Sequence, residues 1–123
     1  MRYLVMIRSN PNFQQLWETW PDDKRMEFGR NHMALSQSLH ESGELIAAEG
    51  LADPSESTVV AMRDGVAVTI DGPYAEVKEH LVGFLLIECD DRERAVQIAA
   101  QVPDAQYGEV EIRPVMDLKS IDF

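Results

Sequence analysis

The chain has 123 residues, and its 22 acidic against 11 basic residues give a formal net charge of −11 at neutral pH. Phosphate binding needs a basic surface, so this charge argues against DNA and RNA as partners. The length fits one domain that buries enough core to fold without a metal, and Cys89, the only cysteine, excludes an intrachain disulfide.

Residues 3–7 form a short, continuously apolar run rich in strand formers, which predicts a buried central strand. The run is too short for the apolar part of a signal peptide, and no stretch approaches the ~20 apolar residues of a membrane span. We therefore expect a soluble, cytoplasmic protein without a membrane partner.

Residues 13–20 form a short amphipathic stretch that ends at Pro21. A long helix is expected from Asp22 to about Ser42, because acidic residues favour the positive end of a helix dipole and Gly43 is a typical helix stop. One face of this helix carries residues spaced by four, three and four positions: Phe28, His32, Leu35 and Leu39.

His32 is the polar member of that face. Its structural interpretation is a histidine at the edge of the core with satisfied hydrogen bonds. Its functional interpretation is a general acid or base, since imidazole titrates near neutrality. His40 lies off the stripe and is expected to be exposed.

Residues 45–51 predict a strand, and the strands expected at 57–62 and 66–70 flank Asp64-Gly65, a strong hairpin signal. Residues 81–89 predict a buried strand in which Gly83 allows close approach of a neighbour. A second helix is expected over 90–102 with Asp90 as its N-cap, and the alternating residues 109–113 predict a last strand.

The stretch between the hairpin and the buried strand at 81–89 contains the predicted site. Asp71, Gly72 and Pro73 have the chemistry of a tight turn, and Glu76 and Lys78 follow in a polar run. Polar groups in a loop between two strands are a common location for a binding site. The alternative is that Asp71 caps its own turn and that the charges are simply solvated.

The order of these elements predicts an α+β fold in which two helices cover one face of an antiparallel sheet. This is the ferredoxin-like split βαβ arrangement, with an added β-hairpin. The other face of the sheet would stay uncovered. A large exposed apolar face normally finds a partner, so we expect a homodimer formed through the sheets.

The sequence Asp71-Gly72-Pro73-Tyr74-Ala75-Glu76, with Lys78, Glu79 and Gly83, resembles the signature of the DGPF-type members of the YCII-related family. Residues 108–115 look like the closing strand of that family, and the resemblance extends to about Leu118. It implies one domain over residues 1–118, a C-terminal tail over residues 119–123, and a dimeric α+β barrel. Tyr74 stands where the family usually has phenylalanine, which adds a hydroxyl to the turn.

The resemblance also implies that a histidine in the first long helix is functional, and His32 matches that position. Related members are credited with a His-Asp dyad, but no motif places its acid in this chain. Asp71 is our candidate on chemical grounds alone, because a carboxylate can orient an imidazole.

Two functions follow. The first is an enzyme in which His32 and Asp71 transfer protons on a small molecule, in a cleft between the long helix and the sheet, with Tyr74, Glu76 and Lys78 as substrate-binding residues. We expect neither cofactor nor metal, because the histidines lack ligand spacing with a cysteine and no phosphate-binding glycine loop is present.

The second function is a non-catalytic ligand- or protein-binding regulatory module, which the family resemblance links to a bacterial transcription-initiation factor. The environment of His32 distinguishes the two functions. A histidine that reaches a solvent-accessible cavity favours the enzyme, and a histidine sealed in the core favours the module.

Overall fold

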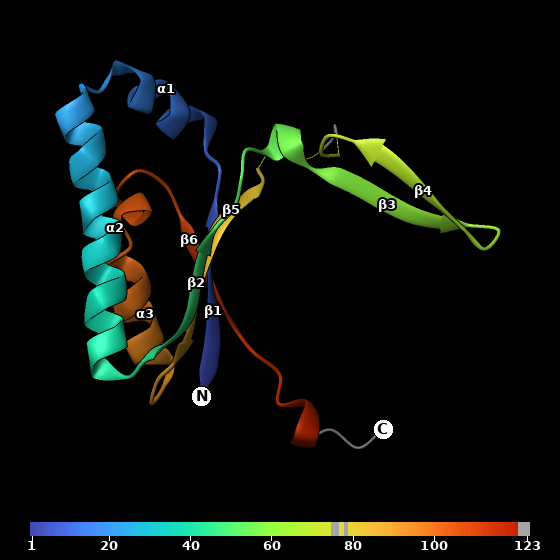
Figure 1. Ribbon diagram of the computed structural model, residues 1–123. Coiled ribbons are helices and arrows are strands. Elements are labelled where there is room, and N and C mark those ends of the chain that lie inside the picture. Colours follow the sequence, from blue (N-terminus) through green and yellow to red (C-terminus); the bar gives the residue numbers. More distant parts are fainter. Residues whose placement is uncertain (75–76, 78, 121–123) are drawn as a thin grey trace.

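The computed structural model describes residues 1–74, 77 and 79–120 as an α+β protein with two antiparallel sheets (Figure 1). The strands are β1 (Arg2–Arg8), β2 (Leu45–Gly50), β3 (Thr58–Arg63), β4 (Val66–Asp71), β5 (Leu81–Glu88) and β6 (Val110–Pro114). The helices are α1 (Pro11–Thr19), α2 (Asp22–Ser42) and α3 (Arg92–Ala100), with short 3-10 helices η1 (Pro54–Glu56), η2 (Pro103–Gln106) and η3 (Leu118–Ser120). The α+β class predicted from the sequence is confirmed.

The larger sheet has the strand order β2-β5-β1-β6, and all its neighbours pair antiparallel. Its two halves, β1–α2–β2 and β5–α3–β6, interleave so that β1 and β5 lie in the centre. This is the predicted split βαβ arrangement. Both α2 and α3 cover the same face of the sheet, and none of the described helices covers the other face (Figure 1).

The helix ends follow from local capping chemistry. Helix α2 begins at Asp22 and stops at Gly43, as expected. The φ angle of Gly43 is 81°, a left-handed value that glycine adopts readily. The predicted N-cap of α3 was one residue too early. The carboxylate of Asp91, not that of Asp90, accepts a hydrogen bond from the backbone N–H of Arg94 at 2.9 Å. In the part of the chain that the structure describes, no helix is both long and apolar enough to cross a membrane.

The hydrophobic core lies between helices α2 and α3 and the inner face of the larger sheet. Alternation along β1 and β5 sends every second side chain inward, and the apolar faces of α2 and α3 close over them. The buried core side chains are Tyr3, Val5, Ile7, Leu35, Leu39, Leu85, Ile87, Cys89, Ala95, Ile98, Ala99 and Val102. The expected burial of Cys89 is confirmed, and this burial raises the pKa of its thiol, which disfavours the reactive thiolate.

Strands β3 and β4 form the smaller sheet, a hairpin that projects away from the rest of the fold (Figure 1). Asp64 and Gly65 connect them with φ angles of 51° and 79°, the left-handed pair that a two-residue hairpin loop requires. The predicted hairpin is confirmed. All six residues of β4 are exposed, so this strand adds nothing to the core of its own chain.

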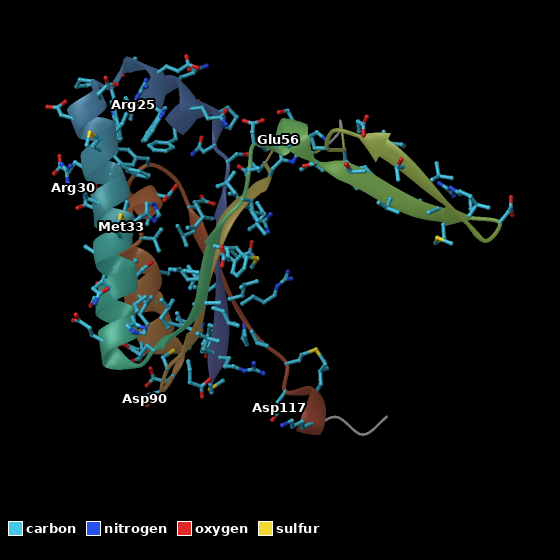
Figure 2. All side chains as sticks on the ribbon, in the orientation of Figure 1. Arg25, Arg30, Met33, Glu56, Asp90 and Asp117 are labelled. Carbon is cyan, nitrogen blue, oxygen red and sulfur yellow. The ribbon has the colours of Figure 1, made fainter. Side chains whose placement is uncertain are left out.

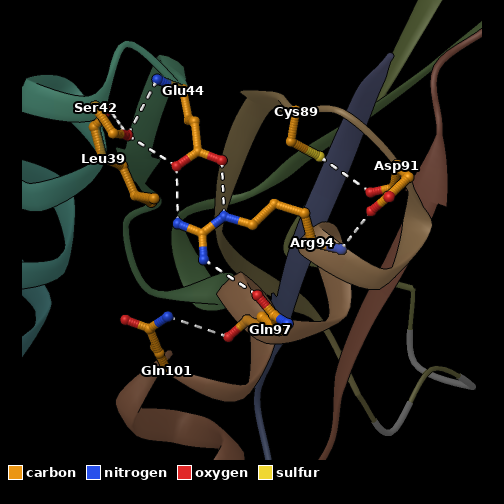
Figure 3. Close-up of polar contacts among 8 residues, drawn as sticks. All are labelled: Leu39, Ser42, Glu44, Cys89, Asp91, Arg94, Gln97 and Gln101. Carbon is orange, nitrogen blue, oxygen red and sulfur yellow. Dashed lines mark hydrogen bonds and ion pairs between the residues drawn. The ribbon is translucent and has the colours of Figure 1, made fainter.

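An ion pair holds α3 against the turn between α2 and β2 (Figure 3). Arg94 donates from Nε to Oε2 and from Nη2 to Oε1 of Glu44, both at 2.8 Å, and the Ser42 hydroxyl donates to Oε1 at the same distance. The hydrogen bonds from Arg94, with a smaller contribution from Ser42, lower the pKa of Glu44 from 4.5 to about 2. The charged carboxylate therefore stabilises the folded chain.

The Glu44→Gln variant should unfold at a lower temperature than the native chain at pH 7, by about 3–6 °C. Because the pKa of Glu44 is lowered on folding, its contribution is complete above pH 4.5 and is lost as the pH falls toward 2. The difference in Tm should therefore shrink over this window, which circular dichroism at a series of pH values measures. Glu41→Gln, at an exposed position in the last turn of α2, is the control. A difference that stays constant down to pH 2 would contradict the assignment.

Candidate functional site

A cleft of about 660 Å³ opens between α2 and the larger sheet. Its size lies within the range of small-molecule sites. The sheet contributes Ile7, Leu45, Ala48, Glu49, Gly50, Val82, Gly83, Phe84 and Leu85, and α2 contributes His32, Met33, Ser36, Gln37 and His40. Asp104 of η2 completes the lining. The cleft therefore has a mostly apolar floor and a mostly polar wall.

Gly83 shapes the floor of the cleft. A Cβ atom at this position would lie 3.2 Å from the backbone oxygen of Glu49 on the neighbouring strand β2. The glycine lets the two strands approach closely, as predicted, and leaves the floor without a side chain at this point.

His32 and Asp104 meet at the cleft, with Nε2 of the imidazole 2.6 Å from Oδ1 of the carboxylate. The side chains are 33% and 19% exposed, so solvent reaches the pair while protein covers most of it. Leu35 lies on the same face of α2 as His32 and is buried, so this face of the helix points toward the sheet. Asp104 lies in η2, directly after the buried Pro103. This 3-10 helix follows closely on the end of α3.

The pair assigns different roles to the two ring nitrogens. An ionised carboxylate only accepts hydrogen bonds, so Nε2 of His32 carries the proton that Asp104 binds. In the neutral ring, Nδ1 then keeps the lone pair and can accept a proton from a bound molecule. In the described ranges 1–74, 77 and 79–120, no three side chains of His, Cys, Asp or Glu are grouped as metal ligands.

Aromatic residues contact both members of the pair. The ring of Phe28 lies one turn before His32 on α2 and contacts the imidazole edge-on, with centroids 5.0 Å apart. The ring of Tyr107 stacks on Phe13 of α1 at 5.0 Å. The backbone N–H of Tyr107 donates to the carbonyl of Asp104 at 3.0 Å, and its own carbonyl accepts from Nδ2 of Asn10 at 3.2 Å. These contacts link α1, α2 and η2 around the pair.

The other predicted site residues lie elsewhere. Asp71 ends β4 on the projecting hairpin, where it pairs in register with Thr58, and Tyr74 follows as an exposed side chain. The expected meeting of Asp71 with His32 does not occur within the chain, because its turn belongs to the smaller sheet. Glu76 and Lys78 lie outside the described residues.

Sequence reasoning missed two features of the cleft. The first is Asp104, whose position after Pro103, just beyond the helix predicted over 90–102, carries no signal of a functional residue. The second is His40, which is exposed as predicted but lines the cleft two turns after His32. The spacing of His32, Ser36 and His40 by four residues was the available signal, since such residues share one helix face.

Comparisons with known proteins agree with this fold. The sequence matches the family described as the YCII-related domain over residues 1–119. An uncharacterized protein of Rhizobium meliloti (strain 1021) is 28% identical over 117 residues, which are 94% of this chain and 92% of that protein. The solved structure of 5-chloro-2-hydroxyhydroquinone dehydrochlorinase from Burkholderia phenoliruptrix AC1100, in complex with 2,5-dihydroxybenzoquinone, is similar with a TM-score of 0.54. That likeness covers 99% of this chain and 100% of the other at 13% identity, which shows the fold alone.

Proposed function

The chain belongs to the family of YCII-related domains, and from this premise we propose that it is an enzyme that transfers protons on a small molecule bound in the cleft beside α2. His32 is the general base, and Asp104 holds its ring and stabilises the imidazolium that forms. Asp104 takes the role first assigned to Asp71. The observation that carries the proposal is the 2.6 Å contact between Nε2 of His32 and Oδ1 of Asp104 at the wall of an open cleft.

The lining of the cleft favours an amphipathic substrate. An apolar ring or chain fits the floor around Ala48, Val82 and Gly83, while hydroxyl or carbonyl oxygens face the polar side chains of α2. The dehydrochlorinase of similar fold was solved with 2,5-dihydroxybenzoquinone, a flat molecule of this kind, which supports its use as a first probe. Tyr74, Glu76 and Lys78 remain predicted substrate contacts.

A homodimer is part of the same proposal. Leu4 and Leu86 are paired neighbours on the face of the larger sheet opposite α2 and α3, as are Met6 and Phe84. An apolar strip in the middle of an uncovered sheet favours association with a second sheet of the same kind.

The alternative remains a non-catalytic regulatory module that binds a ligand or a transcription-initiation factor. The partial exposure of His32 at a cleft favours the enzyme, because a module does not need a histidine and carboxylate at its ligand. A ligand that binds equally well to native and His32-substituted chains and is never altered would favour the module.

A thermal-shift screen tests the enzyme. Small hydroxyquinones and enolisable ketones, beginning with 2,5-dihydroxybenzoquinone, are added to the native chain and to His32→Ala, and unfolding is followed by circular dichroism. A ligand at 100 times its Kd stabilises a folded chain by about 2.7 kcal/mol, a shift of several degrees. We expect such a shift for the native chain and a smaller one for His32→Ala. Equal shifts across the whole panel would contradict the role of His32.

A further inference from the structure

The β3–β4 hairpin, here called the arm, has one apolar face. Its register pairs Val59 with Ile70, Ala61 with Val68 and Arg63 with Val66. Side chains of directly paired residues lie on the same side of a hairpin, and successive pairs alternate between sides. The apolar face of the arm therefore consists of Val59, Ala61, Val66, Val68 and Ile70, with Arg63 at the tip.

The β4 residues of this face are open to solvent in the single chain, while Val59 and Ala61 of β3 are half-buried. Val66 and Ile70 are each 64% exposed and Val68 is 42% exposed. The side chains of the arm project away from the core of their own chain (Figure 2). An isolated two-stranded hairpin is marginally stable in water and becomes stable when one face packs against another surface. Among the residues that the structure describes, no surface of the same chain covers the exposed part of this face, so we expect the arm to be stabilised by packing against another molecule.

A second copy of the chain offers a surface of the right kind and place. The arm and residues 115–120 after β6 both extend on the side of the larger sheet that no described helix covers, so they flank that open face (Figure 1). The sheet alone is a small interface. Leu4, Phe84 and Leu86 are half-buried by their own neighbours, and Met6 is only 6% exposed.

A stable dimer buries about 800 Å² and roughly 20–30 residues on each partner. Four largely covered side chains fall well short of that, so an interface through the sheets needs the exposed apolar residues that flank them. The arm supplies such residues on each copy. In a dimer with two-fold symmetry, both copies use the same patch in the interface. Each arm can therefore pack on the other copy.

We propose that the arm packs its apolar face against a second copy of the chain, reciprocally across a two-fold axis. The inference rests on the proposed homodimer and goes beyond it, since it places the main contact on the arm and on one of the two faces of the arm. The other face, with Val60 and Met62, stays in solvent.

Sedimentation equilibrium at micromolar concentration tests the proposal with two matched variants. The double substitution Val68→Lys/Ile70→Lys puts charges on the apolar face, and Val60→Lys/Met62→Lys puts the same charges on the opposite face. The native chain should have about twice the 13.9 kDa mass of one copy. The first variant should raise the Kd of the dimer about 100-fold or more, because a buried charge without a partner is costly. The second should change it less than about threefold, since exposed substitutions cost little.

Circular dichroism checks that both variants keep the fold, which is expected because the arm lies outside the core. A native chain that sediments as a monomer overturns both the dimer and the arm contact. A native dimer that survives both variants overturns the arm contact while leaving a dimer through the sheets. Equal weakening by both variants overturns the assignment to one face. None of these results bears on proton transfer by His32, which the ligand screen tests separately.

Discussion

The His32→Gln variant is expected to catalyse proton exchange on a bound substrate about 10²–10⁴-fold more slowly than the native chain. Glutamine keeps a polar side chain that can donate to Asp104, but it has no ring nitrogen that takes up a proton near neutral pH. The measurement is the loss of the carbon-bound proton signal of 2,5-dihydroxybenzoquinone, or of the best ligand from the screen, in heavy water by NMR.

Three further variants decide whether the pair itself is responsible. Asp104→Asn should slow exchange about 10–100-fold, because an amide no longer fixes the orientation and proton of the ring. Asp71→Asn should leave the rate nearly unchanged because Asp71 lies on the arm. His40→Gln should slow exchange less than His32→Gln does, because His40 lines the cleft without being the base. Exchange that depends on Asp71 but not on Asp104 would restore the original dyad, with the acid supplied by another copy.

The Ile98→Ala variant should lose about 2–5 kcal/mol of unfolding free energy. Ile98 is fully buried, on the face of α3 that packs into the core between the two helices and the sheet. Removing its outer methyl groups leaves a cavity that this tightly connected core fills only partly. For a chain of this length, the loss corresponds to a fall in Tm of roughly 10–20 °C, which calorimetry or circular dichroism measures.

Val96→Ala is the matched control, two residues earlier on the same helix. Its side chain is 44% exposed, and alanine has the higher helix propensity, so its unfolding free energy should change by less than about 0.5 kcal/mol. Equal losses from the two substitutions would mean that α3 packs on a different face.

The fold could be predicted because its signals are local. The apolar run at residues 3–7, the capped helix from Asp22 to Gly43 and the Asp64-Gly65 turn each determine their own segment through capping, periodicity or turn chemistry. The sequential order of those segments then leaves few packed arrangements. Errors of one residue, such as Asp90 for Asp91 at the N-cap of α3, arise because two adjacent carboxylates carry the same signal.

The acid of the candidate site could not be predicted in this way. Asp104 and His32 are 72 residues apart, and they meet only because α3 and η2 pack beside α2. Nothing in the local sequence distinguishes Asp104 from any other acidic residue that follows a proline. Asp71 has the stronger local signal because turn residues follow it, but that turn lies at the base of the arm, where the backbone N–H of Gly72 donates to the carbonyl of Ser57 at 2.6 Å. His32 was found because an isolated polar residue on an apolar helix face is visible in the sequence itself.

The central position of β1 also sets the order in which the chain can acquire its site. Tyr3 pairs with Ile87 and with Pro114, so β1 finds its two neighbours only after β5 and β6 have been synthesised. Contacts this distant along the chain close slowly, because long loops must be ordered first. While the early segments emerge from the ribosome, α2 can form and carry His32, but Asp104 is still to come. A chain that stops short of η2 would have the histidine without its carboxylate. The pair is therefore complete only after η2 has packed beside α2, and the appearance of activity over time would report that packing.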